Sequence, residues 1–217
     1  MSILEKRKIL TRDEINRVEV VDNDESLVEI EETEKLKLST KRTSIYFNRR
    51  QVVEMLYEAA DHLFKDYMLV LSEGYRSLKR QTVLWEKTLL RIREKSPNLS
   101  EDEIRRRARM LIAEPTKLGP PHSTGGAVDV MLAYSDGTEV EMGGEIGKSG
   151  GKTWTASDGL TEEEEKNRKI LLDVMEQAGF INYPGEWWHY SYGDRMWAAY
   201  TGSDTCFYDG PLPEPKE

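Results

Sequence analysis

The chain has 217 residues and a formal net charge of −9, and 38% of its residues are hydrophobic. This length supports one good-sized core or at most two small ones, and the acidic balance disfavours binding to nucleic acid or to an anionic membrane. There is no apolar run of about 18 residues and no apolar stretch typical of a secretory signal at the N-terminus, so we expect a cytoplasmic protein. A single cysteine, Cys206, excludes an internal disulfide and an all-cysteine metal site.

Hydrophobic periodicity and turn residues place the regular elements. In chain order they predict a strand at 18–21, a strand at 27–30, a helix at 48–63, a strand at 67–71, a helix at 78–95, a helix from 100 that ends before 115, a strand at 127–132, a helix at 161–179, and a closing hairpin of 180–182 with 187–190. Asn48 is expected to cap the first helix. Capping boxes mark two later helix starts, Ser100 with Glu103 and Thr161 with Glu164.

The mixture of helices and strands without regular βαβ alternation predicts an α+β fold, a single domain with a central antiparallel sheet flanked by helices. We expect residues 18–200 to form the core of this domain and residues 1–17 and 209–217 to be peripheral. Gly119-Pro120-Pro121 is not expected in regular structure. Residues 134–160 are rich in glycine and predict a long loop or lid, with a hairpin at Asp136-Gly137. Cys206 is expected near a mobile C-terminus.

His122 and Asp129 belong to one short segment whose glycines permit a tight backbone approach. Asp129 is the one charge within an otherwise apolar strand, and alternation places it on the opposite side from Val128 and Val130. An unpaired buried carboxylate is costly, so Asp129 needs a partner. That partner could be an arginine or a metal ion, and a hydrogen-bonded structural aspartate is the plain alternative.

A second candidate segment reads Gly185-Glu186-Trp187-Trp188-His189. Positions three apart on a strand face opposite sides, so Glu186 must lie in the turn after Gly185 to approach a group bound by His189. We expect Trp187 to share the face of His189 and Trp188 to pack on the other side. The plain alternative is a pair of core tryptophans around a satisfied histidine.

Together these residues predict catalytic metal chemistry. Two neutral imidazoles and one carboxylate leave Zn²⁺ with a net positive charge and an open fourth position for water, although other divalent metals could substitute. A nearby glutamate can move the proton of that water to a leaving amine. Arg76 lies where the strand at 67–71 gives way to the next helix, so its guanidinium could reach a developing oxyanion.

Three stretches carry a family resemblance: GYRSLKRQ, HSTGGAVDV and NRKILLDVMEQAGFINYPGEWWHY. From about residue 18 to 192 the chain resembles the zinc D-alanyl-D-alanine dipeptidases of the VanX type, relatives of VanY-type D,D-carboxypeptidases and of the Hedgehog signalling domain. The resemblance implies a compact α+β fold with the metal in a cleft over an antiparallel sheet. It also implies site roles: one zinc ion bound by His122, Asp129 and His189, Glu186 as general acid/base, and Arg76 stabilising the transition state.

The sequence departs from the VanX pattern at positions near the ends of the substrate. Pro120 stands where the family has a serine that helps hold the substrate carboxylate, and Gly147 where it has an aspartate that holds the substrate ammonium. Further candidates for substrate contact are Ser123, Glu145 and Trp188. We expect zinc-dependent hydrolysis of the D-Ala-D-Ala dipeptide, a small peptide substrate. The alternatives are a D,D- or L,D-carboxypeptidase on longer peptidoglycan stem peptides and a non-catalytic zinc-stabilised binding module.

Overall fold

The computed structural model describes residues 2–41, 46–147 and 152–213. Within them a five-stranded sheet has the order β3-β5-β6-β8-β7. These strands are Leu36–Leu38, Tyr67–Glu73, Ala127–Tyr134, His189–Ser191 and Ile181–Asn182. All neighbouring pairs are antiparallel except β3 and β5, which run parallel. The predicted α+β fold with a central antiparallel sheet is therefore confirmed, with one parallel pair at an edge.

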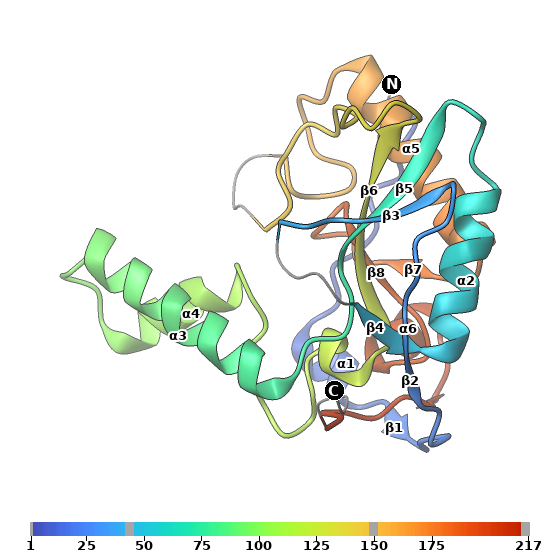
Figure 1. Ribbon diagram of the computed structural model, residues 1–217. Coiled ribbons are helices and arrows are strands. Elements are labelled where there is room, and N and C mark those ends of the chain that lie inside the picture. The colour runs from blue at the N-terminus through green and yellow to red at the C-terminus, as the bar shows by residue number, and fades with distance from the viewer. Residues whose placement is uncertain (1, 42–45, 148–151, 214–217) are drawn as a thin grey trace.

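The main core lies between this sheet and two helices, α2 (Arg50–Asp61) and α5 (Glu162–Gln177), which pack on the same face (Figure 1). Val128, Val130 and Leu132 point into this core from β6, as their alternation predicts. The capping box predicted at the start of α5 is present, with Thr161 and Glu164 each accepting from the other's backbone N–H. Gly179, at φ 99°, follows the end of α5, where a left-handed residue is favoured.

The predicted cap of α2 is wrong. Asn48 lies in β4 (Phe47–Arg49), which pairs with β2 (Leu27–Glu29), and α2 begins without a side-chain cap. The amide of Asn48 instead donates to the carbonyls of Gly125 and Ala127, at 2.9 and 3.0 Å. A buried amide must find partners, and these two carbonyls outcompete a helix end.

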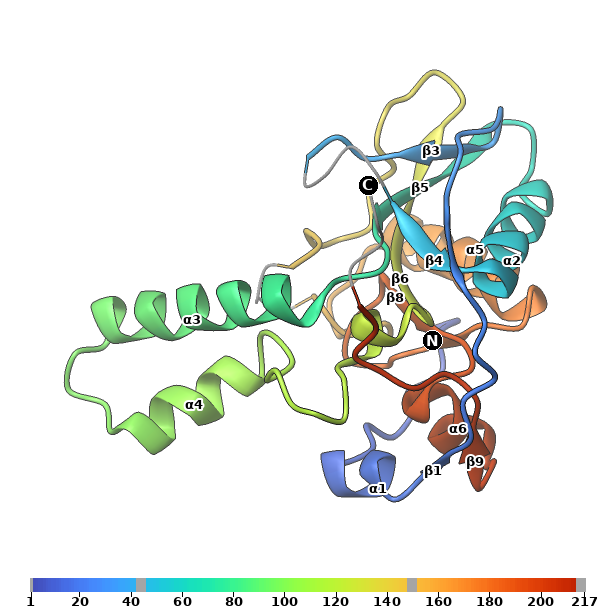
Figure 2. The ribbon, with the colours of Figure 1, turned by 60° about the horizontal axis from the view of Figure 1, so that its bottom comes forward.

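Helices α3 (Leu78–Lys95) and α4 (Glu101–Arg109) form a hairpin that projects from the body of the molecule (Figures 1 and 2). The bounds predicted for α3 are confirmed, and Ser100 caps α4 by accepting from the backbone N–H of Glu103. Only this half of the predicted capping box forms, because the carboxylate of Glu103 accepts from Arg106 and Arg107 instead. This hairpin has a small core of its own, separate from the main core and made of Trp85, Leu89, Ile92, Ile104 and Ala108.

Both ends of the described chain pack onto the body. Strand β1 (Glu19–Val20) pairs in parallel with β9 (Thr205–Cys206), and Leu4 is buried in the main core. Cys206 is a free cysteine, and its side chain is only 1% exposed. The C-terminus that the sequence predicts to be mobile is described only as far as residue 213, and residues 214–217 lie outside the described residues. Within the described part, Leu212 donates its backbone N–H to the carbonyl of Ser123.

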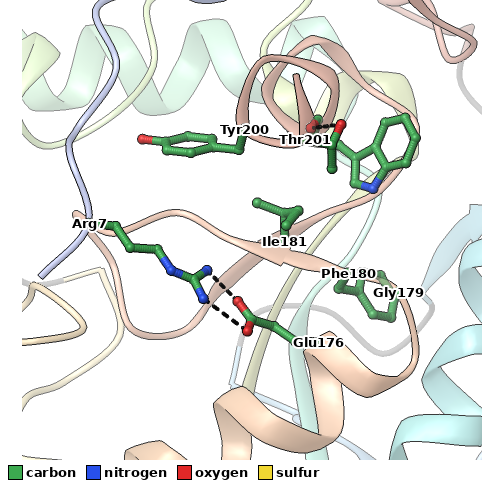
Figure 3. A pocket seen from close by; sticks show the side chains of 8 residues that line it. Arg7, Glu176, Gly179, Phe180, Ile181, Tyr200 and Thr201 are labelled. Carbon is green, nitrogen blue, oxygen red and sulfur yellow. Dashed lines mark hydrogen bonds and ion pairs between the residues drawn. The ribbon is translucent and has the colours of Figure 1, made fainter. Parts of the chain in front are cut away.

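The segment before β1 is fastened by helix α1 (Arg12–Asn16) and by an ion pair. Arg7 forms a two-pronged contact with Glu176 of α5 beside a cavity of about 410 Å³ (Figure 3). Tyr200, on α6 (Arg195–Thr201), accepts the backbone N–H of Leu10 at 3.1 Å. These contacts hold the N-terminal segment across the end of α5 and the face of α6.

Two loop predictions have different outcomes. The hairpin at Asp136-Gly137 is confirmed, since Tyr134 donates its N–H to the carbonyl of Thr138 at 2.8 Å. Pro121 does enter regular structure, because it opens a 3-10 turn, η1 (Pro121–Thr124). A proline is tolerated at the first position of a helical turn, whose N–H has no intrahelical partner. Among the described residues, no helix is both long and apolar enough to cross a membrane.

Candidate metal centre

Strand register brings Asp129 and His189 together. On β6, Asp129 lies directly across from His189 on β8 and from Glu73 on β5. Residues directly opposite in an antiparallel pair have Cβ atoms about 5 Å apart, so their side chains meet on one face. Asp129 Oδ1 is 3.0 Å from His189 Nδ1. Sixty residues of sequence separate this pair, and the sheet closes that gap.

His122 reaches the same point from η1. Gly125 ends this turn in the left-handed region, at φ 73°, and turns the chain into β6. His122 Nδ1 donates to the carbonyl of Gly74 at 2.9 Å, which leaves Nε2 as the nitrogen without the proton. Nε2 lies 3.2 Å from Asp129 Oδ1. A backbone carbonyl thus fixes the tautomer, as is usual around metal-binding histidines.

The three side chains fit a divalent metal ion. Their ligand atoms all lie within 4.8 Å of one another, and all three residues are buried. Four ligands at the usual zinc distances stand about 3.3 Å apart around a tetrahedral ion, close to the 3.0 and 3.2 Å separations from Asp129. The sequence predicted a partner for Asp129, and the structure supplies two imidazoles, which leaves one corner of a tetrahedron open.

The charge states suit such an ion. Burial lowers the pKa of His122, which keeps this imidazole neutral despite the nearby Asp129 carboxylate. Burial alone would raise the pKa of Asp129, but the two histidines outweigh it and hold that pKa far below its ordinary value. Burial alone would lower the pKa of His189, but the hydrogen bond and the charge of Asp129 outweigh it and raise that pKa. The cluster therefore presents an ionised carboxylate and one neutral imidazole, and a metal ion that binds here would displace a proton from His189.

Arg76 follows β5 and is held in place by its neighbours. It is 7% exposed, and its guanidinium donates to the side chain of Gln81 at 2.8 Å. Its backbone N–H donates to the carbonyl of His122 at 3.0 Å. Glu73 lies 3.5 Å from Arg76 Nε and pairs more closely with Arg80, at 2.8 and 3.1 Å. A buried, oriented guanidinium thus stands beside the segment that carries His122.

Glu186 lies in the turn between β7 and β8, as the sequence predicted. Its backbone N–H donates to the carbonyl of Tyr183, and its own carbonyl accepts from His189, at 3.0 and 3.2 Å. Burial and the negative charge of Glu186 raise the pKa of Tyr183 to about 12. The turn is therefore tied to the backbone of a cluster histidine.

Asn182 fastens this turn, and sequence reasoning missed it. Its amide donates to the carbonyls of Glu186 and His189, both at 3.1 Å, and its oxygen accepts from the hydroxyl of Thr155. Asn182 is 1% exposed. No motif marks this role, because the partners are backbone carbonyls that only the folded turn presents.

A cleft of about 1500 Å³ opens over the cluster. Of the eight candidate catalytic, metal-binding and substrate-contacting residues, six line it: Arg76, His122, Asp129, Glu186, Trp188 and His189. Ser123 is fully buried and Glu145 is exposed, and neither is among the residues that line this cleft. Pro120 and Gly147, the two departures from the family pattern noted above, both line it.

The expected placement of the tryptophans is wrong. Trp188 lines the cleft with His189, whereas Trp187 is buried beneath the guanidinium of Arg168, 5.6 Å from its ring centroid. β8 begins at His189, so both tryptophans belong to the preceding turn. Strand alternation therefore does not apply to them.

A buried His-Asp-His cluster, with a carboxylate and a guanidinium on the same cleft, defines a candidate metallohydrolase centre. The sequence was compared with known families and proteins. Residues 33–208 match the profile of the peptidase M15 family, described as D-ala-D-ala dipeptidase. The chain belongs to this family.

Several curated relatives carry the name D-alanyl-D-alanine dipeptidase. One from Synechocystis sp. is 42% identical over 90 residues, which cover 36% of this chain and 36% of the relative. One from Enterococcus faecium is 37% identical over 75 residues, which cover 34% of this chain and 37% of the relative. One from Escherichia coli is 24% identical over 122 residues, which cover 56% of this chain and 53% of the relative. The matched stretches thus span from about a third to about half of these relatives.

The chain is also similar to solved structures. One is VanYB in complex with D-Alanine-D-Alanine, with a TM-score of 0.45 and 16% sequence identity, and the match covers 73% of this chain and 80% of that chain. Another is VanXYg in complex with a D-Ala-D-Ala phosphinate analog, with a TM-score of 0.41 and 18% sequence identity. This match covers 90% of this chain and 72% of that chain.

Proposed function

We propose that this protein is a zinc-dependent dipeptidase that hydrolyses D-Ala-D-Ala to two D-alanines, and that residues 1–217 make a single peptidase domain. The observation that carries the proposal is the convergence of His122, Asp129 and His189 beneath an open cleft in a chain of the dipeptidase family. Curated relatives named D-alanyl-D-alanine dipeptidase support the same substrate.

His122 Nε2, Asp129 Oδ1 and His189 Nδ1 would hold one zinc ion per chain. When bound, zinc supplies Lewis acidity that activates water and polarises a carbonyl group. The carboxylate of Glu186 accepts the proton of the attacking water and delivers it to the amine of the departing D-alanine. The guanidinium of Arg76 stabilises the negative charge that develops on the carbonyl oxygen of the substrate.

The fixed surroundings favour these roles. Asn182 holds the backbone of Glu186 and of His189 together, so the base and one metal ligand move as a unit. Gln81 orients the guanidinium of Arg76. Catalytic groups held by such contacts need little reorganisation during the reaction.

A second candidate function is a D,D- or L,D-carboxypeptidase that acts on longer stem peptides. The cleft favours it in one respect, since about 1500 Å³ exceeds the 300 to 1000 Å³ typical of small-ligand sites. Gly147 on the cleft wall also offers no carboxylate for a dipeptide's free ammonium. Relative turnover of free D-Ala-D-Ala and a muramyl pentapeptide separates the two functions.

The decisive experiment measures D-alanine release from D-Ala-D-Ala by the purified full chain. We expect one zinc per chain, loss of turnover with a chelator, and recovery on addition of zinc. Glu186→Gln should retain zinc but lose at least about 10²-fold in kcat, because it removes only the proton acceptor.

A matched control is Glu176→Gln, which alters a glutamate on α5 that does not line the cleft and should keep normal kcat. A zinc-loaded chain that hydrolyses neither dipeptide nor pentapeptide would support the non-catalytic zinc-stabilised module instead. Normal turnover by Glu186→Gln would remove Glu186 from the mechanism.

A further inference from the structure

We propose that Trp154 is a substrate-contacting residue, whose indole packs against the aliphatic part of a D,D-peptide bound in the cleft. This inference rests on the proposed function. Trp154 is 58% exposed, yet it lines the same cleft as His122 and Glu186. A ligand that covers this indole gains binding free energy, because a large apolar area leaves water.

Backbone hydrogen bonds place Trp154 beside the turn that carries Glu186. The N–H of Trp187 donates to the carbonyl of Thr153, and the N–H of Thr155 donates to the carbonyl of Pro184, each at 3.0 Å. The residues on either side of Trp154 are thus paired with the two ends of the segment 184–187. Trp154 therefore lies in the backbone segment that pairs with the turn of Glu186, the proposed proton acceptor.

The side chain that follows Trp154 points elsewhere. Thr155 is 5% exposed, and its hydroxyl donates to the side chain of Asn182 behind the turn. Trp154 remains open to the cleft. The loop thus uses Thr155 to anchor itself and presents Trp154 to whatever enters.

Arg168 of α5 fixes the backbone of this loop from within the core. Its guanidinium is buried and donates to the carbonyls of Lys152, Trp154 and Thr155. It also donates to the carbonyl of Met142 at 2.6 Å. Arg168 is accordingly a positioning residue, since it orders the loop without lining the cleft.

A rigid aromatic side chain suits recognition. Indoles supply a large contact area, and only two side-chain torsions must be ordered on binding. Because the loop backbone is already fixed, little further entropy is lost when a ligand covers the indole. The methyl groups of D-alanine are the apolar parts of the proposed substrate that such a ring can cover.

The test compares Trp154→Ala with Trp154→Phe, and with Phe64→Ala as a matched control. Phe64 is 73% exposed and does not line the cleft. For Trp154→Ala we expect KM for D-Ala-D-Ala to rise about tenfold, with kcat changed less than about twofold, because contact with an unreacting group binds substrate and transition state alike. Trp154→Phe should recover most of the affinity, and Phe64→Ala should behave as wild type.

A binding readout independent of turnover uses the Glu186→Gln background. D-Ala-D-Ala should change the tryptophan emission of this variant, and Trp154→Phe in the same background should abolish most of that change. Unchanged KM and unchanged emission response in an active enzyme would overturn the role of Trp154 alone. A wild-type chain that neither hydrolyses D-Ala-D-Ala nor responds to it in emission would overturn the proposed function and this inference together.

Discussion

One hydrogen bond decides which nitrogen of His122 faces the cluster. The carbonyl of Gly74 takes the Nδ1 proton, so the lone pair of Nε2 is directed toward Asp129. The residue chemistry of the candidate metal centre was readable in the sequence, because a charge inside an apolar strand demands a partner. The tautomer was not, since it depends on a carbonyl 48 residues away.

Burial gives Cys206 a testable pH dependence. It raises the pKa of the thiol to about 11, whereas an unfolded chain loses this proton at about pH 8.5. Between these values the folded chain binds more protons than the unfolded chain, so the free energy of unfolding falls as pH rises. We expect the urea midpoint to decline from about pH 8.5 to about pH 11 more steeply in the wild type than in Cys206→Ala.

A thiol reagent offers a second check on this residue. At neutral pH the folded chain should react slowly, and addition of urea should expose the thiol. Rapid labelling without denaturant, or an equal alkaline decline in Cys206→Ala, would show that the thiol is not protected by the fold.

At the scale of the element, η1 depends on Gly125. A Cβ at this position would lie 2.6 Å from Leu27 Cδ2 and 3.2 Å from Arg49 Cγ, and φ is +73°. We expect Gly125→Ala to lower the free energy of unfolding by about 2 kcal/mol or more, since left-handed strain alone costs about 1 to 2 kcal/mol. Zinc affinity should also fall, because η1 carries His122.

Gly137→Ala is the matched control for that crowding. Its φ is +89°, but nothing lies within 4 Å of the added Cβ. The two alanine variants therefore share the conformational strain and differ in crowding. Equal losses of stability in urea unfolding, with unchanged zinc affinity in both, would contradict the role assigned to Gly125.

The elements themselves were largely predictable. Periodicity located α3 to its exact bounds, and a capping box located α5, since both signals are local. Sequence reasoning failed where a side chain had to choose between a local and a distant partner. Asn48 resembles a helix cap but binds carbonyls brought in by η1 and β6. Trp187 and Trp188 were assigned strand alternation although they lie in a turn.

At the scale of the whole molecule, the two separate cores predict that the α3–α4 hairpin and the body open with different free energies. The α3–α4 hairpin buries Trp85 in its own cluster. The hairpin projects from the body, as Figure 2 shows. A segment with few apolar contacts to the rest can open without global unfolding. Hydrogen exchange should therefore be faster in α3 and α4 than in β5 and β6.

Two variants separate the cores. Trp85→Ala removes a large side chain, at a cost of about 3 to 5 kcal/mol in a packed site, and should speed exchange in the hairpin only. Leu56→Ala, in the main core, should speed exchange in the central sheet as well. Uniform acceleration by both variants would mean that the hairpin and the body unfold as one unit.

The register of β6 on β8 has a further consequence for assembly of the metal centre. Asp129 and His189 face each other only in this alignment, and a slip by one residue would turn every side chain of the slipped strand to the opposite face. No isolated segment of the chain holds all three ligands. Uptake of a metal ion would therefore report that the central sheet has formed in its correct alignment, and chelation would remove a clamp between strands that are distant along the polypeptide.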